Sequence, residues 1–232
     1  RGLDKVVAVE RRSAPDEFED SKAYLYLVDV RGQRWTDTVP GLTEAIADIG
    51  VSNAEYRLNV AEPDERGVTS RTPLLMRPEM AGAIWVPRAS LLACLSRFAR
   101  DAGADLRYGV AVEDVSRDAA AVHVASSAGT LAAPLIVGAD GARSRVRDFL
   151  ASESSDPSLF EPRVLPSPSG GLQYKMLRVP PSFDLKNLTD GSTIRTVSKE
   201  AYVLPSTSTA RRRRLRLGLL PSRDPELPRT AN

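Results

Sequence analysis

The sequence predicts an α/β protein, and three features carry this prediction. Residues 135–150 (LIVGADGARSRVRDFL) place a short apolar run, a glycine-rich turn and the beginning of a helix in succession. Residues 88–100 (RASLLACLSRFAR) have the apolar spacing of an amphipathic helix. Short β-branched or alternating runs surround these helices, and the last third of the chain contains four of them, which is typical of an antiparallel sheet.

Composition sets outer limits on the kind of protein. The chain has 232 residues, enough for one large domain or two small ones, and 42% hydrophobic and 27% charged residues are typical of a globular protein. The net charge of +2 predicts no affinity for nucleic acid, and no apolar run is long enough to span a bilayer. A lone Cys94 and a lone His123 predict no disulfide framework and no metal site. Because the chain begins with Arg1 rather than Met, its compartment is left open.

The first hundred residues alternate strands and helices. Residues 5–9 (KVVAV) predict a strand that ends at Glu10, and residues 23–30 predict another. Residues 41–49 predict a helix that Gly50 stops, and residues 51–70 are polar with little periodicity. Two short strands are expected at 74–77 and 83–86, before the amphipathic helix at 88–100. Cys94 lies between the apolar positions of that helix, so we expect its thiol to be buried.

The second half begins with a meander and ends with a sheet. Strands are expected at 106–115, 121–125 and 131–135, with a turn at 126–129. Residues 151–171 are rich in Ser, Pro and Gly, which favours a linker. The four strands of the last third are expected at 172–179, 193–198, 201–204 and 215–220. The four consecutive arginines 211–214 are interpreted as a solvated hairpin loop rather than as a basic patch for nucleic acid or lipid.

The glycine-rich turn is the strongest functional signal. Residues 135–137 predict a strand buried on both faces, and Asp140 stands at its carboxyl end between Gly138 and Gly141. Without Cβ atoms, these glycines allow a sharp turn and the close approach of a ligand. Open α/β sheets bind ligands at this edge, where the next helix presents its N-terminus. The alternative is an ordinary turn in which Asp140 only caps the helix.

The residues of this turn carry a family resemblance. The run GADGARSRVR, residues 138–147, resembles the GADGxxSxVR motif of flavoprotein monooxygenases, the FAD-dependent hydroxylases with a para-hydroxybenzoate-hydroxylase-like fold. The resemblance implies a Rossmann-like FAD/NAD(P)-binding domain with a small antiparallel sheet that binds substrate. It also implies that Asp140 contacts FAD and that Gly141 allows its close approach.

Four more residues match family positions. Glu10 matches the glutamate that binds the adenosine ribose of FAD, and Arg11 matches the basic residue that often follows it; the alternative for Glu10 is a solvated charge at a strand end. Arg31, in the RG step after a strand, is a candidate flavin or substrate contact, or else a turn arginine. Arg88 matches the arginine that reaches the FAD pyrophosphate. A cation at a helix start opposes the macrodipole, and an anion beside it would offset that cost.

The resemblance also predicts what this stretch of chain lacks. No GxGxxG occurs, although the family places that loop before the position of Gly2, and the later Gly-Asp motif of the family would lie beyond Asn232. We therefore expect an incomplete chain. The expected division is an FAD-binding domain over 1–70 and 88–150, a substrate-binding sheet over 71–87 and 170–232, and a linker over 151–169.

The activity implied by the resemblance is aromatic hydroxylation. The strings QYKMLRVPPSF and RLGLLPSRD are most similar to kynurenine 3-monooxygenases. Such an enzyme uses FAD, with NAD(P)H as co-substrate and a flavin C4a-hydroperoxide formed from O2, and it needs no catalytic side chain. The expected partners are a small aromatic substrate and O2. The alternatives are an epoxidase or reductase of the same fold, or a truncated chain that binds no flavin and serves as an interaction module. Oligomeric state and the choice between NADH and NADPH are left open.

Overall fold

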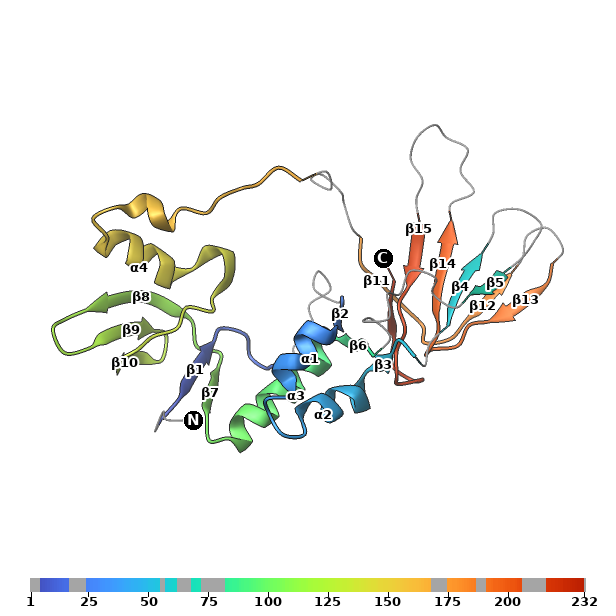
Figure 1. The fold of residues 1–232 in the computed structure, drawn as a ribbon, viewed down its shortest axis with the longest axis horizontal. Coiled ribbons are helices and arrows are strands. Elements are labelled where there is room, and N and C mark those ends of the chain that lie inside the picture. Colours follow the sequence, from blue (N-terminus) through green and yellow to red (C-terminus); the bar gives the residue numbers. More distant parts are fainter. Residues whose placement is uncertain are drawn as a thin grey trace. The chain divides into compact units, whose positions relative to one another are not determined.

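The structure consists of two compact units (Figure 1). It is a computed structural model that describes residues 5–16, 24–54, 57–61, 68–71, 82–167, 175–186, 191–205 and 216–231. Unit 1 comprises residues 1–15 and 99–172, and unit 2 comprises residues 16–98 and 173–232. These units group the chain by compactness. The assignment of one part of the chain to the cofactor and another to the substrate stays a prediction.

Unit 1 contains a parallel strand pair and an antiparallel meander. Strand β1 (Val7–Glu10) pairs in parallel with β7 (Asp105–Tyr108), which places Glu10 opposite Tyr108. The meander has the order β10 (Gly129–Ala133), β9 (Val122–Ser126) and β8 (Val112–Arg117). The single strand expected at 106–115 is wrong: it is divided between β7 and β8, because Gly109, with φ of +72°, turns the chain between them. Because the carboxyl ends of parallel strands meet at one edge, Glu10 lies beside the end of β7.

Helix α4 (Arg145–Glu153) follows the Gly-Asp turn and lies along the meander (Figure 1). An ion pair of 2.8 Å between Arg117 of β8 and Glu153 joins the two. After α4, a short 3-10 helix, η4 (Pro157–Phe160), occupies part of the segment expected to be a linker. The linker interpretation missed it because a single turn begun by Asp156 and Pro157 needs no apolar periodicity.

The turn between β8 and β9 is built on Asp118. Its Oδ1 accepts hydrogen bonds from the amides of Ala120 (2.7 Å) and Ala121 (2.9 Å), and its Oδ2 lies 2.8 Å from His123 Nε2. The two backbone amides, followed by His123, lower the pKa of Asp118 to about 2. The ionised carboxylate therefore stabilises the turn, and protonation of Asp118 weakens these hydrogen bonds.

We expect Asp118 to make unit 1 acid-sensitive. The pKa of Asp118 in the folded state, about 2, lies below the unfolded value of about 3.9. Asp118 therefore stabilises unit 1 fully above about pH 3.9, and this stabilisation is lost as the pH falls toward 2. Asp118→Asn keeps an acceptor but does not titrate, so the gap in melting temperature between wild type and variant should narrow from pH 5 to pH 2.5. Asp114→Asn, on exposed β8 surface, serves as control. An Asp118→Asn gap that is the same at both pH values would contradict the expectation.

The prediction of a buried strand at residues 135–137 is wrong. These residues belong to no strand, and the side chains of Leu135 and Val137 are 65% and 79% exposed. An apolar run becomes a buried strand only where a neighbouring strand completes its hydrogen-bond ladder. In the described part of the chain, no strand pairs with this segment.

The helical part of unit 2 surrounds a three-stranded antiparallel sheet of order β2 (Leu25–Val28), β6 (Ile84–Pro87) and β3 (Val51–Ser52). Three helices accompany it: α1 (Val30–Thr36), α2 (Leu42–Ile49) and α3 (Arg88–Asp101), of which α3 belongs to unit 2 as far as Phe98. Helix α2 ends at Gly50, and α3 begins at Arg88, so both predicted helices are confirmed.

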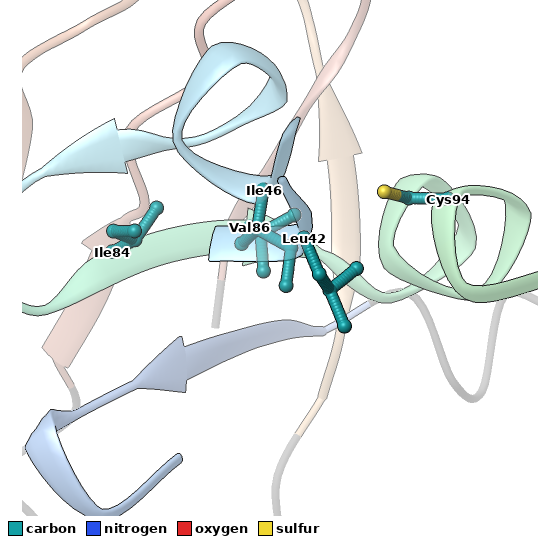
Figure 2. Packing of buried hydrophobic residues seen from close by; sticks show 5 residues of the cluster. All are labelled: Leu42, Ile46, Ile84, Val86 and Cys94. Carbon is teal, nitrogen blue, oxygen red and sulfur yellow. The ribbon is translucent and has the colours of Figure 1, made fainter. Parts of the chain in front are cut away.

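The core of this part forms between α2, β6 and α3. Figure 2 shows Leu42 and Ile46 of α2 beside Val86 of β6, with Cys94 of α3 and Ile84 completing the cluster. Leu42 and Ile46 are one helical turn apart and each is 1% exposed. Burying two such side chains contributes about 1.5–3 kcal/mol each. The Cys94 thiol is buried, as the helical spacing predicts.

The rest of unit 2 is a six-stranded sheet of order β11-β16-β15-β14-β4-β5 with a separate β12–β13 hairpin. The bounds are β11 (Leu177–Val179), β16 (Arg229–Ala231), β15 (Arg216–Leu219), β14 (Ala201–Pro205), β4 (Leu58–Ala61), β5 (Val68–Arg71), β12 (Asp184–Lys186) and β13 (Thr193–Arg195). All neighbours are antiparallel except β14 and β4. Three of the four strands expected in the last third, as β11, β14 and β15, lie in this sheet, whereas the strand expected at 193–198 is β13 of the separate hairpin. Strands β4 and β5 come almost wholly from the stretch 51–70, which lacks periodicity. The expected strand at 74–77 and the arginines 211–214 lie outside the described residues.

A buried arginine holds one corner of this sheet. Arg229 is 2% exposed, and its Nε and Nη2 donate to the Leu220 carbonyl at 3.0 and 2.9 Å. Its Nη1 donates to the Val197 carbonyl at 3.1 Å, and its Nη2 also reaches the Glu200 carbonyl. The guanidinium lies 5.6 Å from the centre of the Tyr202 ring. Burial lowers the pKa of Arg229, and Tyr202 and Glu200 oppose this shift.

No helix in the described residues is long and apolar enough to cross a membrane.

Candidate cofactor-binding site

Glu10 forms an ordered acceptor at the end of β1. Its Oε1 accepts a hydrogen bond from the Arg12 amide at 3.0 Å, and its Oε2 accepts one from Arg12 Nη2 at 3.2 Å. Burial raises the pKa of Glu10, but the Arg12 hydrogen bonds and the positive charges of Arg12 and Arg11 outweigh it and leave the pKa below its ordinary value. Glu10 is therefore a stable carboxylate, and 38% of its side chain remains exposed. Arg11 itself is exposed and attracts Glu10 only by its charge.

Asp140 closes the N-terminus of α4. Its Oδ1 accepts a hydrogen bond from the Ser144 hydroxyl at 2.6 Å, and its Oδ2 accepts one from the Arg145 amide at 2.6 Å. Ser144 in turn caps the helix by accepting from the Arg147 amide at 3.0 Å. Burial raises the pKa of Asp140, but these hydrogen bonds outweigh it, so the carboxylate is ionised. The capping role is thus present, and because Asp140 is exposed, its oxygens retain acceptor capacity for a ligand.

Gly138 and Gly141 are each required in the turn, but for different structural reasons. Gly141 has φ of +78°, a left-handed conformation that side chains disfavour, and a Cβ built there would meet nothing within 4 Å. At Gly138 a Cβ would lie 2.7 Å from the Val146 Cβ of α4. Gly138 is therefore required by close packing of the helix, and Gly141 by the turn itself, with open space beside it.

Arg31 lies at the start of α1 in unit 2. Asp29 caps this helix: its Oδ1 accepts from the amides of Arg31 and Gly32, each at 3.1 Å. The Arg31 guanidinium binds Asp29 Oδ2 through Nε at 3.0 Å and Nη2 at 2.9 Å, and its side chain is 88% exposed. The Gly32 amide and then Arg31 lower the pKa of Asp29. Arg31 is a surface cation in the first turn of α1, it is already paired with a carboxylate, and its other donors are open to solvent.

Arg88 lies beside two tyrosines. Its backbone amide donates to the Tyr24 carbonyl at 3.2 Å. The rings of Tyr24 and Tyr26 meet edge to face with centres 5.4 Å apart. The hydrogen bond with Tyr24 and partial burial raise the pKa of Tyr26, while a hydrogen bond and the positive charge of Arg88 oppose that rise. The Tyr26 phenol is thus one partner of this guanidinium at the first residue of the helix.

The predicted residues fall into separate groups. Glu10, Arg11, Asp140 and Gly141 belong to unit 1, whereas Arg31 and Arg88 belong to unit 2. Within unit 2, the β2–β6 register pairs Leu25 with Pro87 and Val28 with Ile84. Arg88 therefore lies at the beginning of β2 and Arg31 follows its end, with about 10 Å of strand between. These two arginines are not brought together.

Sequence reasoning missed two partners of the predicted residues. Arg12 holds Glu10 and is only 18% exposed, and Tyr26 contacts Arg88. An available signal for Arg12 was its position two residues after Glu10 at the end of a strand, where a bend brings its amide to the Glu10 carboxylate. The described residues contain no cluster of three or more His, Cys, Asp or Glu side chains suited to a metal ion.

Comparisons with known proteins give the family. A family model described as FAD binding domain matches residues 31–161, which is more than half of the chain and includes the Gly-Asp turn. No curated protein sequence matches significantly. Among solved structures, aklavinone-11 hydroxylase in a ternary complex with FAD and aklavinone is 18% identical with a TM-score of 0.52, over 98% of this chain and 40% of that one.

Two further structures share the fold. CtdE in complex with FAD and a substrate is 10% identical with a TM-score of 0.55, over 98% of this chain and 50% of that one. A variant of P. aeruginosa PqsL is 21% identical with a TM-score of 0.52, over 98% of this chain and 53% of that one. The chain thus spans about half the length of the structures that it matches. The predicted α/β fold class, with a partial Rossmann-like domain and small antiparallel sheets, is confirmed, and the chain belongs to the FAD binding domain family.

Proposed function

We propose that the full-length protein containing this chain is an FAD-dependent monooxygenase that uses NAD(P)H and O2 to hydroxylate a small aromatic substrate, with kynurenine as the first candidate. The family match over residues 31–161 carries the proposal. The fold shared with aklavinone-11 hydroxylase, a structure that contains FAD and aklavinone, supports it. In this proposal residues 1–70 and 88–150 serve the cofactor, residues 71–87 and 170–232 the substrate, and residues 151–169 link them.

The chemistry of the donor set fits FAD. Glu10 offers an ionised, partly exposed carboxylate for the adenosine ribose hydroxyls, with Arg11 beside it. Arg88 offers a guanidinium for the pyrophosphate. Asp140 offers carboxylate oxygens, and the open space beside Gly141 leaves room for a ligand. Arg31 offers its remaining donors to flavin or substrate.

The chain contributes binding and orientation. Bound FAD would supply the redox chemistry, because it accepts a hydride from NAD(P)H and activates O2. We assign a catalytic role to no side chain. Glu10 and Arg12 keep the ribose acceptor charged and in place, Asp140 and Ser144 fix the turn before α4, and Tyr26 holds Arg88 at the start of α3.

Flavin binding tests the proposal. The full-length protein and the 232-residue chain are titrated with FAD, and binding is followed by quenching of flavin fluorescence. The full-length protein should bind FAD and oxidise NAD(P)H faster when kynurenine or another electron-rich aromatic is added. Binding without substrate-dependent hydroxylation would favour a reductase or epoxidase of the same fold. If neither form binds FAD, the proposal fails and a flavin-free interaction module takes its place.

Asp140 should affect both stability and flavin binding. Asp140→Ala removes the acceptor of the Ser144 hydroxyl and of the Arg145 amide, so unit 1 should lose about 1–2 kcal/mol of unfolding free energy. If Asp140 also contacts FAD, the Kd should rise about tenfold, as for one charged hydrogen bond. Ser144→Ala is the control, because it weakens the cap and keeps the carboxylate. Equal losses of FAD affinity in both variants would assign Asp140 to the cap alone.

A further inference from the structure

We infer that Arg12 is a positioning residue for the cofactor: it fixes the Glu10 carboxylate at the end of β1 in the orientation that accepts the adenosine ribose hydroxyls of FAD. The inference rests on the proposed function and concerns a residue that the family motif does not include.

The first support is the double contact between the two residues. Each oxygen of Glu10 accepts one hydrogen bond from Arg12, Oε1 from the backbone amide at 3.0 Å and Oε2 from Nη2 at 3.2 Å. Two bonds from different parts of Arg12 fix both the position and the rotation of the carboxylate. Each oxygen keeps a second lone pair, so the carboxylate can still accept two hydroxyl donors. A vicinal diol presents two such donors.

The second support is that Arg12 is itself anchored. Its carbonyl accepts a hydrogen bond from the Gly109 amide at 2.7 Å, and the Glu10 carbonyl accepts one from the Val110 amide at 3.0 Å. Both bonds tie residues 10–12 to the turn after β7. Gly109 has φ of +72°, which lets this turn form. The Arg12 side chain is 18% exposed and that of Glu10 is 38% exposed, so the inner partner holds the outer one toward solvent.

The third support is the contrast with Arg11. Arg11 has the same side chain and adjoins Glu10, but it is exposed and affects Glu10 through charge alone. Loss of charge near Glu10 is common to substitutions at both positions. Loss of orientation is specific to Arg12, because Arg11 donates no hydrogen bond to Glu10 that shifts its pKa.

The test compares two flavins in the full-length protein. FAD carries the adenosine ribose and FMN does not, so only FAD affinity should depend on Arg12. Arg12→Met keeps the buried stem and removes the guanidinium. We expect it to raise the Kd for FAD about tenfold, the effect of one charged hydrogen bond, with an unchanged Kd for FMN. Arg12→Lys should recover part of the affinity. Arg107→Met serves as the control, because Arg107 is paired with Asp105 on the neighbouring strand β7, and it should change the FAD affinity less than twofold.

A double variant separates positioning from direct contact. If Arg12 acts through Glu10, Glu10→Gln combined with Arg12→Met should bind FAD no more weakly than Glu10→Gln alone. Additive losses, an equal loss of FMN affinity, or an equal effect of Arg107→Met would overturn the inference. A wild-type protein that binds neither flavin would instead refute the proposed function, and the two failures are therefore distinct.

Discussion

Arg229→Ala is expected to lower the free energy of unfolding of unit 2 by about 3–5 kcal/mol, as the loss of a buried charged network does. The guanidinium donates to the carbonyls of Leu220, Val197 and Glu200, and the side chain is 2% exposed. Alanine would remove this donor from all three carbonyls, although the Val197 carbonyl keeps the Glu200 amide at 3.0 Å, and it would open a cavity beside Tyr202. Each unsatisfied buried acceptor costs about 1–3 kcal/mol before relaxation or water entry reduces the total.

Urea unfolding followed by tryptophan fluorescence measures this effect, because Trp35 and Trp85 both belong to unit 2. Arg229→Lys should lose most of the same stability, since an ammonium lacks the planar fork that reaches several carbonyls. Arg195→Ala is the matched control. Its ion pair with Asp184, at 3.0 Å, joins side chains that are 66% and 55% exposed and contributes about 1 kcal/mol or less. Similar losses for Arg229→Ala and Arg195→Ala would show that the buried network is not stabilising.

Helices α2 and α3 could be predicted because their cause is local, whereas α1, which begins at the last residue of the strand expected at 23–30, was missed. Leu42 and Ile46 are one turn apart, Gly50 ends the helix, and the apolar stripe of α3 includes Cys94. Strands β4 and β5 could not be predicted in this way. β4 pairs with β14, so Leu58 lies opposite Ala201, a neighbour that no local pattern reveals. The buried role of Arg229 is equally hidden, since its acceptors lie at residues 197, 200 and 220 and only the folded sheet brings them together.

In the candidate site, too, local features could be predicted and features that depend on distant residues could not. The Gly-Asp turn was located correctly, since Asp140 stands at the start of a helix and Gly141 has a positive φ. The preceding strand was wrong, because burial of residues 135–137 depends on a pairing partner rather than on their own apolarity. The flavin contacts of Glu10, Arg11, Arg31, Arg88, Asp140 and Gly141 stay predictions. What the structure adds is the set of protein groups that hold them, such as Arg12 for Glu10 and Asp29 for Arg31.

Gly138→Ala is expected to destabilise unit 1 by about 1–3 kcal/mol, the usual cost of overpacking. The new Cβ would lie 2.7 Å from the Val146 Cβ and 3.0 and 3.1 Å from its two Cγ atoms. The nearest atom is attached directly to the helix backbone, so a rotamer change cannot relieve the contact and α4 must shift. Because Ser144 and Asp140 fix the start of α4, that shift should also disturb the turn.

Substitutions at Gly141 separate this packing effect from backbone strain. Gly141→Ala should cost about 1–2 kcal/mol through its φ of +78° alone, and Gly141→Asn should cost less, since asparagine tolerates the left-handed region. Gly138→Asn, by contrast, should be at least as damaging as Gly138→Ala, because any Cβ meets Val146. Thermal melting of the four variants by circular dichroism distinguishes the two causes. If asparagine rescues position 138 as it does position 141, helix packing is not the reason for Gly138, and a backbone or ligand requirement must replace it.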